Sequence, residues 1–179
     1  MAGLLRRYKS PLYGNYRKYS LLYGAVSGAV LFVFVVVSYL AGSPISTPET
    51  YGTDAVLAVC IFVSSYLYRE RQTGGKIFLK ELLVLGMGIG VVAGAVYGVL
   101  LLAYGGVVDA DFCGRCINAR IDMMPNESAE DMLAISSVKE YSLGDWAFIG
   151  GFRTFVMSII ITFFSAIVFR TEQSIRREK

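Results

Sequence analysis

The chain has 179 residues, 55% of them apolar, with a formal net charge of +3 and a mean hydropathy of +0.54. The apolar residues gather into four long blocks, which is unusual for a soluble domain of this size. The composition therefore predicts an all-α polytopic membrane protein with four transmembrane helices, and it argues against a transmembrane β-barrel.

The N-terminal segment, residues 1–18, is basic and aromatic and holds no acidic residue, which suits the headgroups of an anionic leaflet. Residues 20–40 form the first predicted span. Its apolar block exceeds the ~7–15 residues of a signal-peptide core, so we expect an uncleaved helix. Gly24 and Gly28 form a small-xxx-small pair, which we expect to dock against the glycines of the third span.

The second predicted span, residues 52–68, is the shortest of the four. A loop with Pro44 and Pro48 is expected before it, over residues 42–53. Asp54 is expected near a membrane interface, as a negative charge at a helix N-terminus.

The third predicted span, residues 80–104, carries a glycine at every fourth position of its apolar run: Gly86, Gly90, Gly94 and Gly98. Inside a water-soluble helix each glycine would cost about 1 kcal/mol relative to alanine. In lipid the same glycines let another helix backbone come close, so the stripe indicates a helix-packing or partner face.

Residues 105–145 form a hydrophilic loop in which acidic residues outnumber basic ones. Within it, residues 126–138 have the pattern of a short amphipathic helix, which we expect along the membrane surface or over the bundle mouth.

The fourth predicted span, residues 147–169, has small residues at intervals of four: Gly150, Thr154, Ser158 and Thr162. We expect this ladder to face the third helix or a partner protein. Two small-residue faces exceed what internal packing needs, so one of them is expected to bind another membrane protein or a second copy.

The distribution of basic residues predicts the orientation. Most Lys and Arg lie in the segments that would share one side of the membrane: Arg6, Arg7, Lys9, Arg17, Lys18, Arg69, Arg71, Lys76, Lys80, Arg170, Arg176, Arg177 and Lys179. Three lie in the other loops. The positive-inside rule then places both termini in the cytoplasm and the acidic loop outside.

Cys113 and Cys116 have the Cys-x-x-Cys spacing and lie in the loop predicted to be outside. A local disulfide is the leading interpretation, because that compartment is oxidising. Free thiols, thiol–disulfide exchange and a metal site completed by Asp109, Asp111 or a second copy are the alternatives.

Arg153 is the only charged residue well inside a predicted span, since Asp54, Lys80 and Glu81 lie at span ends. A charge at that depth is costly unless it is paired or reaches the interface, so Arg153 is a functional candidate. The expected partners are Asp145, Asp109, Asp111 or the phosphate of a lipid or another anionic ligand.

The motifs of an enzyme are missing from the sequence. It holds no histidine and no nucleotide-binding loop, so we expect no catalytic residue and no cofactor.

The order of these features resembles a family of bacterial four-helix inner-membrane proteins of unknown function. The likeness rests on the entry into the first helix (Tyr19 to Gly28), the turn from Tyr68 through Gly74-Gly75-Lys76 into the third helix, and its exit at Asp109 to Phe112. The resemblance implies the four-span fold, the bacterial inner membrane and no known activity. It further suggests an accessory role beside a polyprenyl-phosphate glycosyltransferase.

The leading functional hypothesis is a non-enzymatic accessory or scaffold subunit that contacts membrane lipids and another membrane protein or a second copy, but no nucleic acid. A lipid or small-solute carrier with Arg153 as the anion contact is one alternative. An envelope thiol–disulfide protein that uses Cys113 and Cys116 is another.

Overall fold

The computed structural model describes residues 12–41, 47–72, 79–121, 137 and 140–177, and within these residues the chain forms helices and no strand. Four helices are long and apolar enough to cross a membrane, over Tyr16–Leu40, Tyr51–Arg71, Leu79–Val108 and Leu143–Val168. The predicted fold class, an all-α protein with four membrane-spanning helices, is therefore confirmed.

The four long helices are α1 (Leu12–Leu40), α2 (Thr47–Gln72), α3 (Leu79–Ala103) and α6 (Leu143–Arg177). The loop predicted up to residue 53 is wrong in part, because α2 already begins at Thr47. Pro48 does not prevent this early start, since the first turn of a helix leaves its N–H groups without intrahelical partners.

Two shorter elements follow α3. A π-helical turn, η1 (Tyr104–Val108), closes α3, and the chain then enters α4 (Phe112–Ile121). Helix α4 was not predicted from the sequence. The amphipathic helix predicted over residues 126–138 lies, apart from Ser137, outside the described residues.

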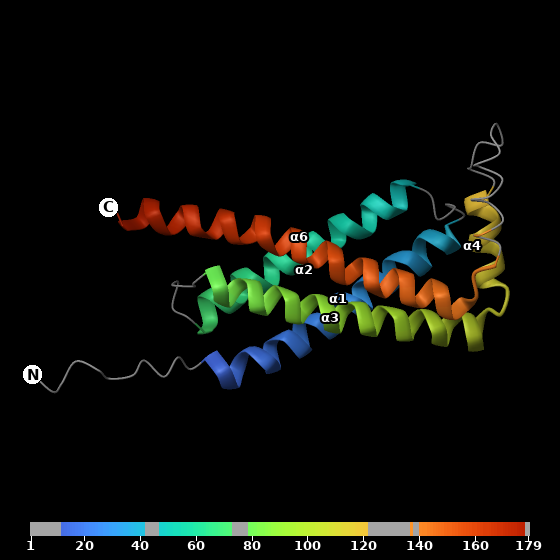
Figure 1. Cartoon of the computed structure of the whole chain (residues 1–179), viewed down its shortest axis with the longest axis horizontal. Coiled ribbons are helices and arrows are strands. Elements are labelled where there is room, and N and C mark those ends of the chain that lie inside the picture. Colours follow the sequence, from blue (N-terminus) through green and yellow to red (C-terminus); the bar gives the residue numbers. More distant parts are fainter. Residues whose placement is uncertain (1–11, 42–46, 73–78, 122–136, 138–139, 178–179) are drawn as a thin grey trace, which may run out of the picture.

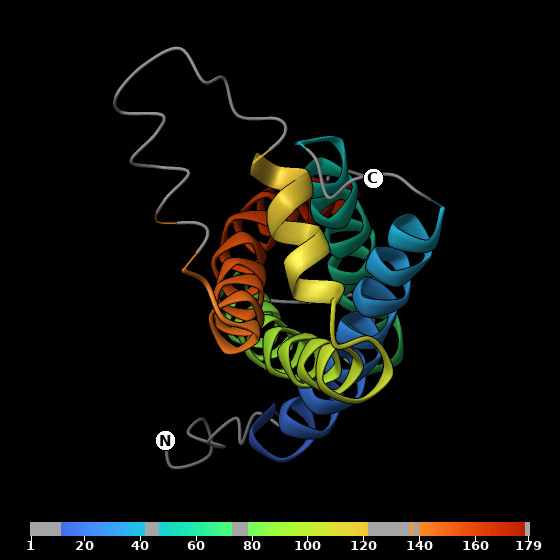
Figure 2. The ribbon, with the colours of Figure 1, turned by 90° about the vertical axis from the view of Figure 1, so that its right-hand side faces the viewer.

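The long helices form a ring in the order α1, α3, α6, α2, and α4 lies across one end of it (Figure 2). Helix α3 packs closely against α1 and α6, whereas α2 is held more loosely by its neighbours. Helices α1 and α3 run in the same direction. The N-terminal end of α1 and the C-terminal end of α6 both lie at the end of the bundle opposite α4 (Figure 1).

The centre of the ring is filled by aliphatic side chains from all four long helices. One buried cluster contains Leu31 of α1, Leu57 and Ile61 of α2, Leu85 and Ile89 of α3, and Ala166 of α6. This cluster joins the loosely held α2 to the rest of the bundle.

Helix α6 begins at a reciprocal cap. The backbone N–H and the hydroxyl of Ser142 donate to Oδ2 of Asp145 at 2.8 and 2.7 Å, and the N–H of Asp145 donates back to Ser142 Oγ at 3.2 Å. Such a cap satisfies N–H groups that a helix start leaves unpaired. Asp145 is thereby engaged at the helix start and does not pair with Arg153.

Candidate functional site

Helices α3 and α6 meet along a seam where glycines of α3 face small residues of α6. A Cβ atom added to Gly86 would lie 2.1 Å from Thr162 Oγ1, and one added to Gly90 would lie 1.7 Å from Ser158 Oγ. The two hydroxyls therefore occupy the space that side chains on these glycines would need.

The seam continues with direct backbone contact. A Cβ on Gly94 would lie 2.4 Å from the carbonyl oxygen of Gly151, and one on Gly98 would lie 3.1 Å from that of Ala147. The expected ladder of Gly150 and Thr154 is therefore replaced here by Gly151 and Ala147. A helix with ~3.6 residues per turn drifts away from a strict four-residue step, which explains the change of register.

Gly150 and Thr154 face the bundle interior beside the seam. The nearest side-chain atom to a Cβ on Gly150 belongs to Tyr97, at 3.0 Å. The hydroxyl of Thr154 donates to the carbonyl oxygen of Gly150 at 2.8 Å.

The expectation that Gly24 and Gly28 dock against the glycine stripe is wrong. They face another side of α3, where added Cβ atoms would lie 2.6 Å from Val92 Cβ and from the carbonyl oxygen of Ala93, respectively. The stripe glycines of α3 (Gly86, Gly90, Gly94 and Gly98) point at α6, so α3 uses two different faces for its two close neighbours. Sequence spacing alone does not fix the rotation of one helix about its axis relative to another.

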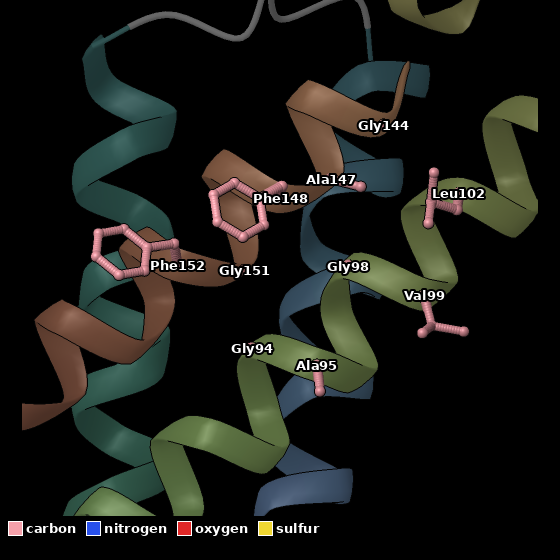
Figure 3. Close-up of a pocket in the computed structure, with 10 residues that line it drawn as sticks. All are labelled: Gly94, Ala95, Gly98, Val99, Leu102, Gly144, Ala147, Phe148, Gly151 and Phe152. Atoms are coloured by element: carbon pink, nitrogen blue, oxygen red, sulfur yellow. The ribbon is translucent and has the colours of Figure 1, made fainter. Parts of the chain in front are cut away.

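A groove of about 350 Å³ opens beside the seam, between α3 and α6 (Figure 3). Its floor consists of the small residues Gly94, Gly98, Ala147 and Gly151, which the close contact of the two helices brings together.

The walls of this α3/α6 groove are large apolar side chains that no other described residue covers. Phe148 and Phe152 of α6 are 72% and 57% exposed, and their rings are stacked with centroids 6.1 Å apart. Val99 and Leu102 of α3 line the opposite side. The groove is thus an apolar, open depression on the outer face of the bundle.

Arg153 finds its partner on α2. Its Nη2 donates to Oδ2 of Asp54 at 2.6 Å, with the two side chains 39% and 21% exposed. The prediction that Arg153 pairs with Asp145, Asp109 or Asp111 is wrong for this contact. Asp54 was expected at a helix N-terminus, but it lies in the second turn of α2. No local sequence pattern indicates this pairing, because the two residues are 99 positions apart.

The ion pair borders a cavity of about 40 Å³ to which all four long helices contribute, among them Leu31, Asp54, Tyr97 and Arg153. A polar cavity of this size holds a few water molecules at most. In the described arrangement it has no room for a larger solute.

A second charged cluster fastens α4 to the end of the bundle. Arg115 of α4 donates to both carboxylate oxygens of Asp109, the hydroxyl of Tyr39 donates to Asp109 Oδ2 at 3.1 Å, and the Arg115 guanidinium lies 5.7 Å from the Tyr39 ring centroid. Desolvation raises the pKa of Asp109, but the hydrogen bonds from Arg115 and Tyr39 and the Arg115 charge outweigh it and hold that pKa below its ordinary value.

Cys113 and Cys116 lie one turn apart at the start of α4, and no disulfide bond joins them. Cys116 is only 3% exposed, packed with Phe112, Leu101 and Ala147. Desolvation and the charge of Asp145 raise the pKa of Cys113. Reactive cysteines normally have a lowered pKa, so this environment does not activate the thiol.

No cluster of three or more His, Cys, Asp or Glu side chains that could hold a metal ion occurs among the described residues. The arrangement instead offers two features with recognisable chemistry: the α3/α6 groove and the intramembrane ion pair.

These features define a multi-pass helical membrane protein. The chain belongs to the family described as "Protein of unknown function (DUF4199)", whose model matches residues 22–171. No curated protein and no solved structure matches the chain.

Proposed function

We propose that the protein is a non-enzymatic accessory or scaffold subunit of a membrane complex in the bacterial cytoplasmic membrane, with both termini in the cytoplasm. The α3/α6 groove carries the proposal, and its occupant is an apolar transmembrane helix of another membrane protein. The polyprenyl-phosphate glycosyltransferase that the family resemblance suggests is the first partner to test.

The groove favours a helix over a lipid chain as its occupant. Lipid tails are as apolar as the groove walls, so moving a chain from the bilayer into the groove gains no hydrophobic energy. A helix gains dispersion contacts when a row of its side chains fits between fixed walls above a floor of small residues. The stacked Phe148 and Phe152 provide one such wall.

The sequence suggested a partner site because two helices carry more small residues than internal packing needs. The site proposed here is a different one. The glycines of α3 and the small residues of α6 contact each other inside the bundle, so neither face is left over for a partner. The site for a partner is instead the open flank of the seam, where the backbone of α3 and α6 lies between exposed apolar side chains.

The alternatives receive less support from the geometry. A carrier that uses Arg153 as an anion contact would have to break the pair with Asp54 and enlarge a cavity of about 40 Å³. A thiol–disulfide protein would depend on Cys113, whose pKa is raised.

The test blocks the groove without altering the seam. Ala95 lines the groove and is exposed, so Ala95→Phe fills it with a ring while the contacts of the neighbouring glycines stay in place. A photo-crosslinking amino acid at Val99 should join the protein to one partner in native membranes, and Ala95→Phe should abolish that product. The same amino acid at Val37, which is exposed on α1, is the control.

The proposal fails if Val99 and Val37 give the same products, or if Ala95→Phe leaves the Val99 product unchanged. A product of twice the chain mass would identify a second copy as the occupant and contradict the assignment to another protein.

A further inference from the structure

The end of the bundle opposite α4 carries a basic surface built from three helices. Arg17 and Lys18 at the start of α1, Arg71 at the end of α2 and Lys80 at the start of α3 are all exposed. We call these four residues the basic end. Of the nearby carboxylates, Glu70 is exposed and Glu81 is half-buried.

The opposite end of the described molecule carries more acidic than basic residues. Asp109, Asp111, Glu140 and Asp145 lie there, against Arg115, which is bound to Asp109, and Arg120 of α4. The excess of basic residues is therefore found at one end of the described bundle. A general attraction to anions over the whole surface would not show this asymmetry.

Aromatic packing holds the helices that present the basic end. The ring of Tyr19 stacks on Tyr23 with centroids 5.8 Å apart and meets the buried Tyr68 of α2 edge-on at 5.5 Å. Arg69, next to Tyr68, is itself buried. The basic side chains on α1 and α2 are thus carried by elements that are already fixed against each other, which lowers the ordering cost of binding.

The position of the basic end relative to the membrane surface determines which anions it can contact. Leu21 and Leu22 lie about one turn after Lys18, and Leu79 precedes Lys80; all three are exposed apolar side chains on helices that cross the membrane. Charged groups one turn from such side chains lie at the level of lipid headgroups, where long basic side chains reach phosphates.

We propose that the basic end binds the headgroup phosphates of anionic phospholipids in the leaflet that surrounds it. This inference does not depend on a partner in the α3/α6 groove, and it holds whichever leaflet that is.

The experiment uses the purified full-length protein in phosphatidylcholine vesicles with trace spin-labelled phosphatidylglycerol or phosphatidylcholine. The motionally restricted fraction of each label gives the selectivity between the two lipids. We expect a preference of about threefold or more for phosphatidylglycerol, which weakens as salt screens the charges. Inorganic phosphate should reduce the preference no more than chloride at equal ionic strength.

Neutralising the four basic residues tests the site. The variant Arg17→Gln, Lys18→Gln, Arg71→Gln, Lys80→Gln should lose the preference, whereas Arg17→Lys with Arg71→Lys should keep it. Arg115→Gln, at the opposite end, should not change it. If the fourfold variant does not fold, Lys18→Gln with Lys80→Gln should give a partial loss.

Equal restriction of both lipids by the wild type overturns the proposal. It also falls if the Gln variants retain the wild-type preference, or if phosphate displaces the lipid more effectively than chloride does. None of these results bears on cross-linking at Val99, so the two proposals can fail separately.

Discussion

Gly94 and Gly151 illustrate how single residues hold this bundle together. Each lacks the Cβ atom that would otherwise collide with the carbonyl oxygen of the other, at 2.4 and 2.8 Å respectively. Helices in lipid gain little from hiding apolar surface from one another, so close backbone approach and the dispersion and Cα–H···O contacts that it allows stabilise the pair.

Gly94→Ala should therefore destabilise the protein. The new methyl group would meet a backbone carbonyl that moves only if a helix moves, so we expect a loss of about 1–3 kcal/mol. Thermal unfolding in mild detergent measures this. Gly114→Ala is the matched control, because no atom lies within 4 Å of its added Cβ; a helical glycine replaced by alanine there should be neutral or gain up to ~1 kcal/mol. Equal melting of Gly94→Ala and the wild type would refute the role of the close contact.

Arg153 and Asp54 join α6 to α2, the long helix that packs least closely against its neighbours. Arg153→Leu should leave membrane insertion intact but destabilise the bundle, because it leaves the Asp54 carboxylate without this partner. The cost should fall below the about 3–5 kcal/mol of a fully buried pair, since both groups are partly exposed.

A double-mutant cycle isolates this interaction. Arg153→Leu combined with Asp54→Leu should cost less than the sum of the single changes, because no unpaired charge remains. Unfolding temperatures of the four proteins in detergent provide the comparison. Strictly additive effects would show that the pair contributes nothing beyond its separate residues.

At the scale of elements, α4 is held by one ion pair and by the packing of one buried aromatic side chain. Phe112 is buried against Tyr39 and Tyr104, with ring centroids 5.0 and 5.3 Å away, and Arg115 binds Asp109 directly after η1. The position of α4 over the bundle end is thus set by Tyr39 of α1 together with Tyr104 and Asp109 at the end of the third span.

Asp109→Asn should weaken the attachment of α4, in a pH-dependent way. The folded-state pKa of Asp109 lies below the ordinary value of 3.8, so its contribution to stability is present above that value and is lost as the pH falls through the folded-state pKa. The difference in melting temperature between wild type and Asp109→Asn should be full at pH 7 and should shrink below about pH 4. A difference that stays constant down to the lowest pH would argue against the charged contact.

The elements that could be predicted are those that depend only on their own local sequence. Long apolar blocks define the spans whatever their neighbours are, which is why four membrane-spanning helices could be foreseen. Helix α4 was missed because its ten residues mix cysteines, charges and apolar groups without a clear stripe, and its docking depends on Tyr39, far away in the chain.

The candidate site was less accessible from the sequence. The stripe of Gly86 to Gly98 correctly indicated a helix-packing face, but which helix it meets depends on the rotation of every helix in the ring. The α3/α6 groove is lined by residues of two helices that are far apart in the sequence, so no single segment encodes it. The same reason hid the pairing of Asp54 with Arg153.

At the scale of the whole molecule, charge is separated along the bundle axis. Basic side chains gather where α1 and α3 begin, and acidic ones gather around α4. Both the anionic cytoplasmic leaflet and the positive-inside rule favour the basic end in the cytoplasm. The orientation proposed above therefore follows from the same asymmetry that motivates lipid binding, although each has its own test.

Labelling of introduced cysteines measures that orientation in intact cells. In a background with Cys60, Cys113 and Cys116 replaced by serine, we expect Glu140→Cys to react with a membrane-impermeant maleimide, since Glu140 is exposed near the start of α6. Lys80→Cys, which is exposed at the other end, should react only after the membrane is permeabilised. Removing Lys80 leaves the other basic residues in place, so the variant itself should not invert the protein. The reverse pattern would place the basic end outside the cytoplasm and would exclude the proposed topology. A partner helix could then contact the bundle only in the opposite orientation.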